Sequence, residues 1–471
     1  MNQRKSFNSL RNPSSERNSN VDNLPNLDIH DNINEDIEIS STTLRTLEIM
    51  KMCRKRIIYP FNIMLMMVGW RPVGSQMYHY DTNQRFLCIF NSILLGVLVT
   101  LVAFSYSYQI LTCRFVMSPE DKITTPPPEN VTSKMATLVN STKTNIMECS
   151  HIVTTYVIPS FIHFMAYLLG ILHYRFRKNE DIYGLMEKAL QYSTSMEQNK
   201  KTQYKVTTRL SIWMAAACIW VCLSLTNHIM YDVAFDTFSK PFYSNHINAE
   251  NKINASLGNF LFILDIFGFL LMSIVTTVVI LNYVLYCELV KFYVNAISKK
   301  IEMRHIKLNV VKNDIQIIGI AIDLINSTTG TMTSLIYFYT MTLFIGGLNM
   351  LLNNEMFQIN KEMVLAFRIY FVIHLMPLLI VPLIQCARVN KATECFKEWA
   401  LHMSVFGYRK EKRKELDSFL LYAIGYSSKA KLLSVPLQWP HIFIVCSFGG
   451  LILLSIIQTG IWCNLRFIGK L

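Results

Sequence analysis

Seven apolar blocks of membrane-spanning length divide this chain of 471 residues. A helix needs about 20 mainly apolar residues to cross about 30 Å of hydrocarbon, and each block reaches that length. The whole chain is 51% hydrophobic and only 16% charged, which is too apolar for a soluble domain. The sequence therefore predicts an all-α membrane protein with seven transmembrane helices, at residues 86–112, 152–172, 210–231, 257–286, 330–352, 364–386 and 441–463.

Basic residues are distributed unevenly over the segments that connect these blocks. Lys and Arg number 30 on the side that includes the segment before the first block, against nine on the opposite side. Such an excess marks the cytoplasmic side of a multi-pass protein. We therefore expect a plasma-membrane protein with a cytoplasmic N-terminus and, after seven crossings, an extracellular C-terminus. G-protein-coupled receptors have the opposite orientation and are excluded on this ground.

Glycosylation sequons give a second test of orientation, because only asparagines on the luminal side are modified. Asn130, Asn140 and Asn254 lie in segments expected outside, so we expect a glycoprotein modified there. Asn326 lies on the expected cytoplasmic side and should be unmodified. The two cysteines that bracket the first outside segment, Cys113 and Cys149, are either a disulfide or two unpaired thiols, since spacing does not reveal whether their Cα atoms are close.

The first outside segment yields a direct experiment. We expect the double substitution Asn130→Gln/Asn140→Gln to abolish the gel shift that glycans on this segment cause, because both sequons are then lost. Wild-type protein treated with an endoglycosidase marks the position of the unmodified chain. A wild-type protein that shows no shift at all would contradict the orientation.

The segments outside the blocks are of two kinds. Residues 1–43 are polar and rich in Asn and Ser, and we expect a disordered cytoplasmic tail there, followed by one membrane domain over 44–471. Residues 57–69 are apolar but too short to cross, which favours an interfacial or re-entrant segment.

Two long connections on the cytoplasmic side, 287–329 and 387–440, are predicted to be helical extensions of the membrane helices. Within the second, residues 416–437 are apolar on a helical period that is interrupted by Gly425, Ser427, Ser428 and Lys429. We interpret the stretch as a packed cytoplasmic helix. If that stretch crossed the membrane instead, the C-terminus would move inside.

Several function classes find no support in the sequence. The net charge of +13 comes from short segments between apolar blocks, where membrane orientation explains it, so we expect no nucleic-acid partner. The sequence has no HExxH, GxSxG or Walker motif and no CxxC pair, and we therefore expect neither an enzyme nor a metal or cofactor. A transporter would show repeated hydropathy halves, which are absent.

Three stretches carry a family resemblance: YPFNIMLMMVGWRPV at 59–73, VKNDIQIIGIAIDLINSTTGTM at 311–332 and LILLSIIQT at 451–459. With the inverted seven-span topology, they resemble the insect-type gustatory and odorant receptor superfamily of seven-transmembrane ligand-gated ion channels over most of 50–465. The gustatory branch carries Thr-Tyr, five apolar residues and Gln-Phe in the last helix. Here Gln458 keeps its place. Leu451 and Ile452 stand where Thr-Tyr would be, Ser455 interrupts the apolar run, and Thr459 replaces Phe.

The resemblance implies a chemosensory, ligand-gated, non-selective cation channel of the gustatory-receptor-like branch. Its partners would be a small-molecule ligand, the permeant cations, membrane lipid and three further subunits of a homo- or hetero-tetramer. The cytoplasmic helices would form a shared anchor, and the pocket would lie in the outer half of each subunit. The alternatives are a light- or peroxide-sensing member of the same family, or a membrane transporter.

One face of the last block is the expected pore lining. At helical spacing, an apolar ring with adjacent Ser and Gln would suit a gate that dewets when it is narrow. The alternative is a span packed against its neighbours, with Gln458 as an interhelical hydrogen-bonding group. The face consists of Leu451, Leu454, Ser455, Gln458 and Trp462.

Polar and aromatic residues near the outer ends of the other spans are the candidates for the ligand pocket, because burying such groups is costly unless they are paired or used. Two of them, Asp265 and Arg368, could pair with each other or could both snorkel to water. The candidates are Tyr156, His163, Trp220, Asn227, His228, Phe262, Asp265, Tyr337, Phe344, Arg368, Phe371 and His374.

Overall fold

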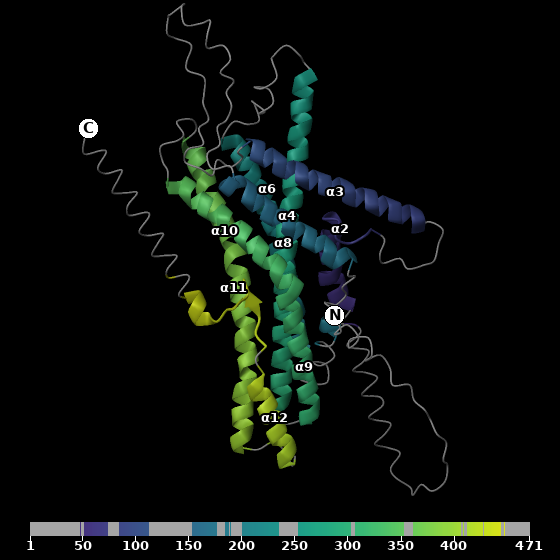
Figure 1. Cartoon of the computed structure of the whole chain (residues 1–471), viewed down its shortest axis with the longest axis vertical. Helices are drawn as coiled ribbons and strands as arrows, with labels where there is room; N and C mark the ends of the chain where they lie inside the picture. The colour runs from purple at the N-terminus through teal and green to yellow at the C-terminus, as the bar shows by residue number, and fades with distance from the viewer. Residues whose placement is uncertain are drawn as a thin grey trace, which may run out of the picture. The chain divides into compact units, whose positions relative to one another are not determined.

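The computed structural model of the chain (Figure 1) places most of the predicted spans. It describes residues 48, 51–73, 84–112, 153–176, 184–187, 189, 200–234, 253–302, 307–352, 361–406, 408, 412–426, 428–443 and 447. The predicted tail, the residues Cys113, Asn130, Asn140 and Cys149, and the predicted pore face at 451–462 lie outside the described residues. Asn254 lies in the first turn of a helix, with its side chain outside the description.

The described part of the chain is almost entirely helical. Its elements are η1 (Arg54–Ile58), α2 (Tyr59–Met67), α3 (Gln84–Thr112), η2 (Val153–Val157), α4 (Ile158–Gly170), η3 (Ile171–Phe176), α6 (Lys200–Ala234), α8 (Ile253–Glu302), α9 (Leu308–Leu324), η5 (Ile325–Thr329), α10 (Gly330–Leu352), α11 (Lys361–Phe406), α12 (Arg413–Gly425), β1 (Lys431–Leu432) and β2 (Val435–Pro436). The elements marked η are short π-helical turns adjoining α-helices: η1, η2 and η5 continue into an α-helix, and η3 follows α4.

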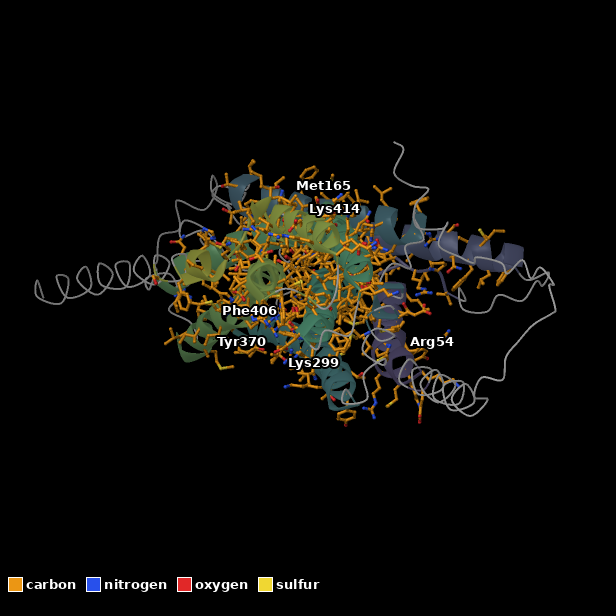
Figure 2. All side chains as sticks on the ribbon, turned by 90° about the horizontal axis from the view of Figure 1, so that it is seen from below. Arg54, Met165, Lys299, Tyr370, Phe406 and Lys414 are labelled. Carbon is orange, nitrogen blue, oxygen red and sulfur yellow. The ribbon has the colours of Figure 1, made fainter. Side chains whose placement is uncertain are left out.

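Six helical stretches are long and apolar enough to cross a membrane, and they correspond to the first six predicted spans. They are Phe86–Ile110, Val153–Phe176, Tyr204–Ala234, Asn259–Glu302, Leu308–Leu351 and Met363–Phe406. Large apolar side chains such as Ile93, Met165 and Ile219 point outward, and Met165 is labelled in Figure 2. An outward apolar surface on helices of this length is typical of a multi-pass membrane protein.

Helix α8 is the centre of the packing. Every residue from Leu271 to Val290 is buried, because α3, α6, α10 and α11 all pack against this helix. The sequence of this stretch, LMSIVTTVVILNYVLYCELV, is mostly apolar around the whole helix, with a few polar residues and one charged residue, Glu288. A helix of that composition is suited to burial on all sides.

Beyond the apolar stretches, α8 and α11 continue as regular helices, and α9 and α12 pack beside them (Figure 1). The predicted helical extensions 287–329 and 387–440 are therefore helical for most of their length. The charged residues in them lower the hydropathy of the sequence without interrupting the backbone hydrogen bonds.

The prediction of one helix over 416–437 is wrong after Gly425. The chain leaves α12 there and forms a two-residue hairpin, with Lys431 opposite Pro436 and Leu432 opposite Val435. Both turn residues have positive φ, Leu433 at 55° and Ser434 at 63°, as a tight hairpin between right-twisted strands requires. Side chains from distant helices hold this backbone, and the periodicity of the stretch itself cannot reveal them.

The predicted interfacial segment 57–69 is helical and ends at a left-handed glycine, Gly69, with φ of 75°. This turn directs Trp70 into the protein, where its side chain is completely buried. The indole stacks on Tyr174 at 5.4 Å and on Tyr167 at 6.2 Å between ring centroids. The segment is thereby fixed against α4 and η3.

Candidate functional site

A cavity of about 60 Å³ lies where α3, α6, α8, α10 and α11 meet. Its wall combines rings, hydroxyl groups, amides and aliphatic side chains. The lining consists of Gln109, Trp220, Ser224, Asn227, Phe269, Met272, Ser273, Thr276, Tyr339, Thr340, Leu343, Phe371, His374, Leu375 and Leu378.

The hydroxyl groups of the wall are held in place by the helices that carry them. Ser273 Oγ donates to the carbonyl of Phe269 at 3.0 Å, and Thr340 Oγ1 donates to the carbonyl of Ile336 at 2.8 Å. Ser224 Oγ and Ser273 Oγ lie 2.8 Å apart and join α6 to α8. Bonds of this kind satisfy a hydroxyl within its own helix and leave its oxygen able to accept a bond from a ligand.

Stacked rings form the wall on the side of α6 and α11. The ring centroids of Trp220 and His374 are 4.7 Å apart at an interplanar angle of 15°. The indole Nε1 of Trp220 also donates to the carbonyl of His374 at 3.2 Å. Tyr370 stacks on the other side of the imidazole at 6.1 Å. This arrangement offers flat apolar surface with few rotatable bonds, which suits an aromatic ligand.

A polar chain lies behind the wall. Tyr106 bonds to Nδ1 of His163, whose Nε2 lies 2.8 Å from Oγ1 of Thr276. Thr276 and Tyr339 line the cavity, and the Tyr339 ring centroid is 4.5 Å from that of His163. His163 therefore supports two lining residues and does not itself line the cavity.

A cluster of ionisable side chains lies beside the cavity. Nε2 of His228 is 3.4 Å from Oδ2 of Asp265 and 3.8 Å from Oδ2 of Asp232, and all three side chains are buried. The imidazole stacks on Phe269, a lining residue, at 4.3 Å. The predicted alternatives for Asp265 and Arg368 included snorkelling to water, and the burial of both side chains argues against it.

The predicted pocket residues fall into two groups. Trp220, Asn227, Phe371 and His374 line the cavity. The others lie behind or beside it, as His163, His228 and Asp265 do, or on other parts of the helices: Tyr156, Phe344 and Arg368 are buried and Phe262 and Tyr337 are half-buried.

Sequence reasoning missed most of the hydroxyl and amide groups of the wall: Gln109, Ser224, Ser273, Thr276, Tyr339 and Thr340. Ser and Thr are ordinary constituents of membrane helices, so their presence alone did not mark them as pocket candidates. A signal was nevertheless present, because Phe269, Ser273 and Thr276 recur on one face of α8 at helical spacing.

The hairpin 431–436 and the residue before it form hydrogen bonds with α10 and α11, two of the helices that line the cavity. From α10, Oγ of Ser334 accepts a bond from the Leu433 N–H at 3.0 Å. From α11, Oδ1 of Asn390 accepts a bond from the Ala430 N–H at 2.7 Å. The hairpin also directly precedes the last predicted span. It therefore connects the walls of the cavity to the chain that enters 441–463.

No model of a known protein family matches the sequence. No curated protein matches it either. Among solved structures, the insect olfactory receptor OR5 from Machilis hrabei, in complex with eugenol, aligns with a TM-score of 0.50 at 10% sequence identity. The alignment covers 89% of this chain and all of the receptor chain. This protein therefore has a multi-pass helical fold that is similar to the fold of an insect olfactory receptor.

Proposed function

We propose that the chain is one subunit of a chemosensory, ligand-gated, non-selective cation channel of the insect-type gustatory and odorant receptor superfamily. The observation that carries the proposal is the cavity lined by rings and hydroxyl groups among five membrane helices. The likeness in fold to an olfactory receptor solved with eugenol, a small aromatic ligand with a hydroxyl group, supports the same assignment. The predicted orientation and the predicted sequons support a location in the plasma membrane as part of this proposal.

The size of the cavity suggests how a ligand would act. About 60 Å³ is room for a few water molecules, at about 10–15 Å³ each, and is less than an aromatic ligand needs. A ligand must therefore displace lining side chains and separate the helices that carry them. The ligand then favours the arrangement with separated helices. The size of this population shift is set by how much more tightly the ligand binds that arrangement than the closed one.

The hairpin 431–436 provides the mechanical link in this proposal. A movement of α10 or α11 around a ligand would pull on the hairpin through Ser334 and Asn390. The hairpin would then displace the start of the last span. In this proposal, four copies of that span surround the pore in a homo- or hetero-tetramer, with Leu451, Leu454, Ser455, Gln458 and Trp462 facing the ions.

Whole-cell current in a heterologous cell tests the function. We expect current in response to small aromatic alcohols and phenols, with eugenol as the first probe. Thr340→Val should raise the half-maximal concentration about tenfold without changing the maximal current, because one hydrogen bond to the ligand contributes about 1–1.5 kcal/mol. Thr342→Val on the same helix is the matched control, since Thr342 is not a lining residue, and it should leave the response unchanged.

The pore assignment is tested in the same cells. We expect Gln458→Leu to abolish the current while surface expression is retained. Absence of any conductance from surface-expressed wild-type tetramers would contradict the channel, and ligand uptake without current would favour the transporter. A response to light or peroxide without an organic ligand would identify the other kind of family member.

A further inference from the structure

A second cavity, of about 370 Å³, opens between the N-terminal part of α6 and the C-terminal part of α8. Four cationic side chains line it: Lys205 and Arg209 from α6, and Lys291 and Lys299 from α8. Glu288 is the one carboxylate of the lining. We call this cavity the basic cleft.

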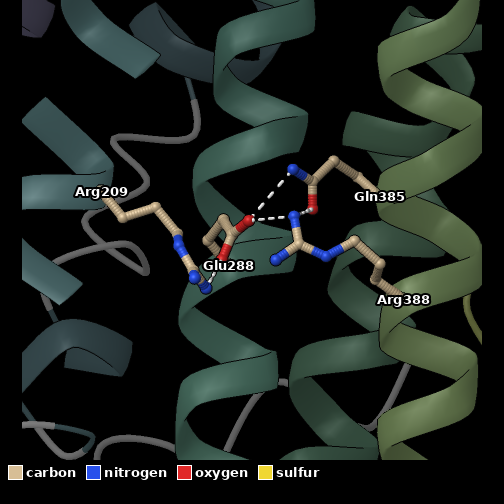
Figure 3. Close-up of polar contacts among 4 residues, drawn as sticks. All are labelled: Arg209, Glu288, Gln385 and Arg388. Carbon is tan, nitrogen blue, oxygen red and sulfur yellow. Dashed lines mark hydrogen bonds and ion pairs between the residues drawn. The ribbon is translucent and has the colours of Figure 1, made fainter. Parts of the chain in front are cut away.

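Glu288 is already engaged from the other side of α8, as Figure 3 shows. Its Oε1 lies 2.7 Å from Nη1 of Arg388 and accepts a bond from Nε2 of Gln385 at 3.1 Å. Arg388 and Gln385 belong to α11 and do not line the basic cleft. The opposite oxygen, Oε2, is 3.5 Å from Nη1 of Arg209. Arg388 thus neutralises the carboxylate from outside, and the cleft keeps an excess of positive charge.

Two lysines of the cleft, Lys205 and Lys291, have capacity for an anion. In the part of the chain that the structure describes, neither Lys205 nor Lys291 forms a hydrogen bond or an ion pair. Like charges that share a cavity repel each other, and a bound anion would relieve this repulsion. The guanidinium of Arg209, which is 42% exposed, can also offer two parallel N–H groups to a phosphate.

The remaining wall of the cleft is apolar. Leu210 and Phe292 are buried beneath the cationic groups, with Val206 and Ala296 beside them. A bare inorganic anion would gain no favourable contact with this apolar surface. A ligand with a charged head and an apolar body would contact both parts of the wall.

The cleft also lies at a defined level along the helices. Lys205 and Arg209 directly precede the span predicted from residue 210, and Glu288 and Lys291 follow the span predicted to end at 286. With the predicted orientation, this level is the cytoplasmic surface of the membrane. Anionic lipids are concentrated in that leaflet, and basic pockets between helices bind their head groups.

We propose that the basic cleft binds the phosphorylated head group of an anionic membrane lipid, with Lys205, Arg209 and Lys291 as its main contacts. The proposal rests on the predicted orientation and does not require that the chain conducts ions. Head-group binding would fix the cytoplasmic end of α6 against α8 at the bilayer surface.

The test is a binding titration on the full-length protein in a neutral detergent. The probe is a fluorescent, short-chain phosphatidylinositol bisphosphate. We expect Lys205→Gln/Lys291→Gln to weaken binding about 25-fold, at about fivefold for each lysine. The single variant Lys205→Gln, at an exposed position, should show the fivefold loss alone. The matched control is Lys391→Gln/Lys397→Gln, which removes two exposed lysines from α11 outside the cleft and should leave binding unchanged.

Two competitors distinguish the sources of phosphate. We expect unlabelled short-chain phosphatidylinositol bisphosphate to displace the probe at much lower concentration than soluble inositol trisphosphate or inorganic phosphate. Equal weakening by the cleft pair and the control pair would overturn the site, because it would indicate general surface attraction. Equal competition by the soluble anions would overturn the lipid assignment.

Discussion

Replacing Gly170 with alanine is expected to lower the stability of the solubilised protein by about 3 kcal/mol, which is at the upper end of the usual cost of overpacking. A Cβ at this position would lie 2.1 Å from Cζ2 of Trp70 and 2.3 Å from Cε2. The indole cannot retreat, because it is completely buried and stacked on Tyr167 and Tyr174. The measurement is the midpoint of thermal unfolding in detergent.

A double-mutant cycle shows whether the indole is the cause. Trp70→Phe shortens the ring system that Gly170 faces, so the alanine should cost less in the Trp70→Phe background than in the wild type. Gly96→Ala is the matched control, because nothing lies within 4 Å of a Cβ there. It should be neutral or slightly stabilising in helix α3. Equal losses for Gly170→Ala and Gly96→Ala would contradict the close approach.

Replacing Asn390 with alanine is expected to be comparably damaging, at about 3 kcal/mol, because it removes three hydrogen bonds to buried or partly buried backbone groups of Ala430 and Leu437. The side-chain Nδ2 donates to the carbonyl of Ala430 at 2.9 Å and to that of Leu437 at 2.7 Å. Oδ1 accepts from the Ala430 N–H at 2.7 Å. The expected result is a lower unfolding midpoint together with increased proteolysis between α12 and residue 437.

Asn326→Ala is the comparison for this variant. Asn326 makes two similar bonds to the same hairpin, from Nδ2 to the carbonyl of Lys429 at 2.9 Å and from the Lys431 N–H to Oδ1 at 2.7 Å. These bonds lie closer to solvent, where water replaces them, so the loss should be smaller, about 1 kcal/mol. A larger loss of stability for Asn326→Ala than for Asn390→Ala would show that burial does not determine how much these hydrogen bonds to the hairpin contribute.

The six described spans could be predicted from the sequence because the signal is local. About 20 consecutive apolar residues suffice to identify a crossing, whatever the helix packs against. The full length of the helices could not be predicted in this way. Glu288 and Lys291 end the apolar run of α8, yet the helix continues to Glu302, because α9 and α11 pack against the extension.

The hairpin and the cavity both depend on contacts between residues far apart in the sequence. For this reason the predicted helix over 416–437 was wrong after Gly425, and the predicted set of cavity residues was incomplete. Residues 416–437 have the periodicity of a helix. The side chains of Asn390 and Asn326, however, form hydrogen bonds with the backbone of 429–437, and those backbone groups would be bonded within the helix if it continued. In the cavity, the predicted Trp220 and His374 were recognisable as isolated polar aromatics. Ser224 and Ser273 could not be recognised as a pair from the sequence, because only the packing of α6 against α8 brings their Oγ atoms within 2.8 Å.

The complete burial of Leu271–Val290 has a consequence for biosynthesis. Two of the helices that cover this stretch, α10 and α11, emerge from the ribosome after α8 has been inserted. Until they arrive, one side of α8 faces lipid, and assembly then exchanges that lipid for protein. Ser273 and Thr277 are suited to both stages, because their hydroxyls donate to carbonyls of α8 itself. Helix α8 can thus remain stable in the bilayer until α10 and α11 have been synthesised and pack against it.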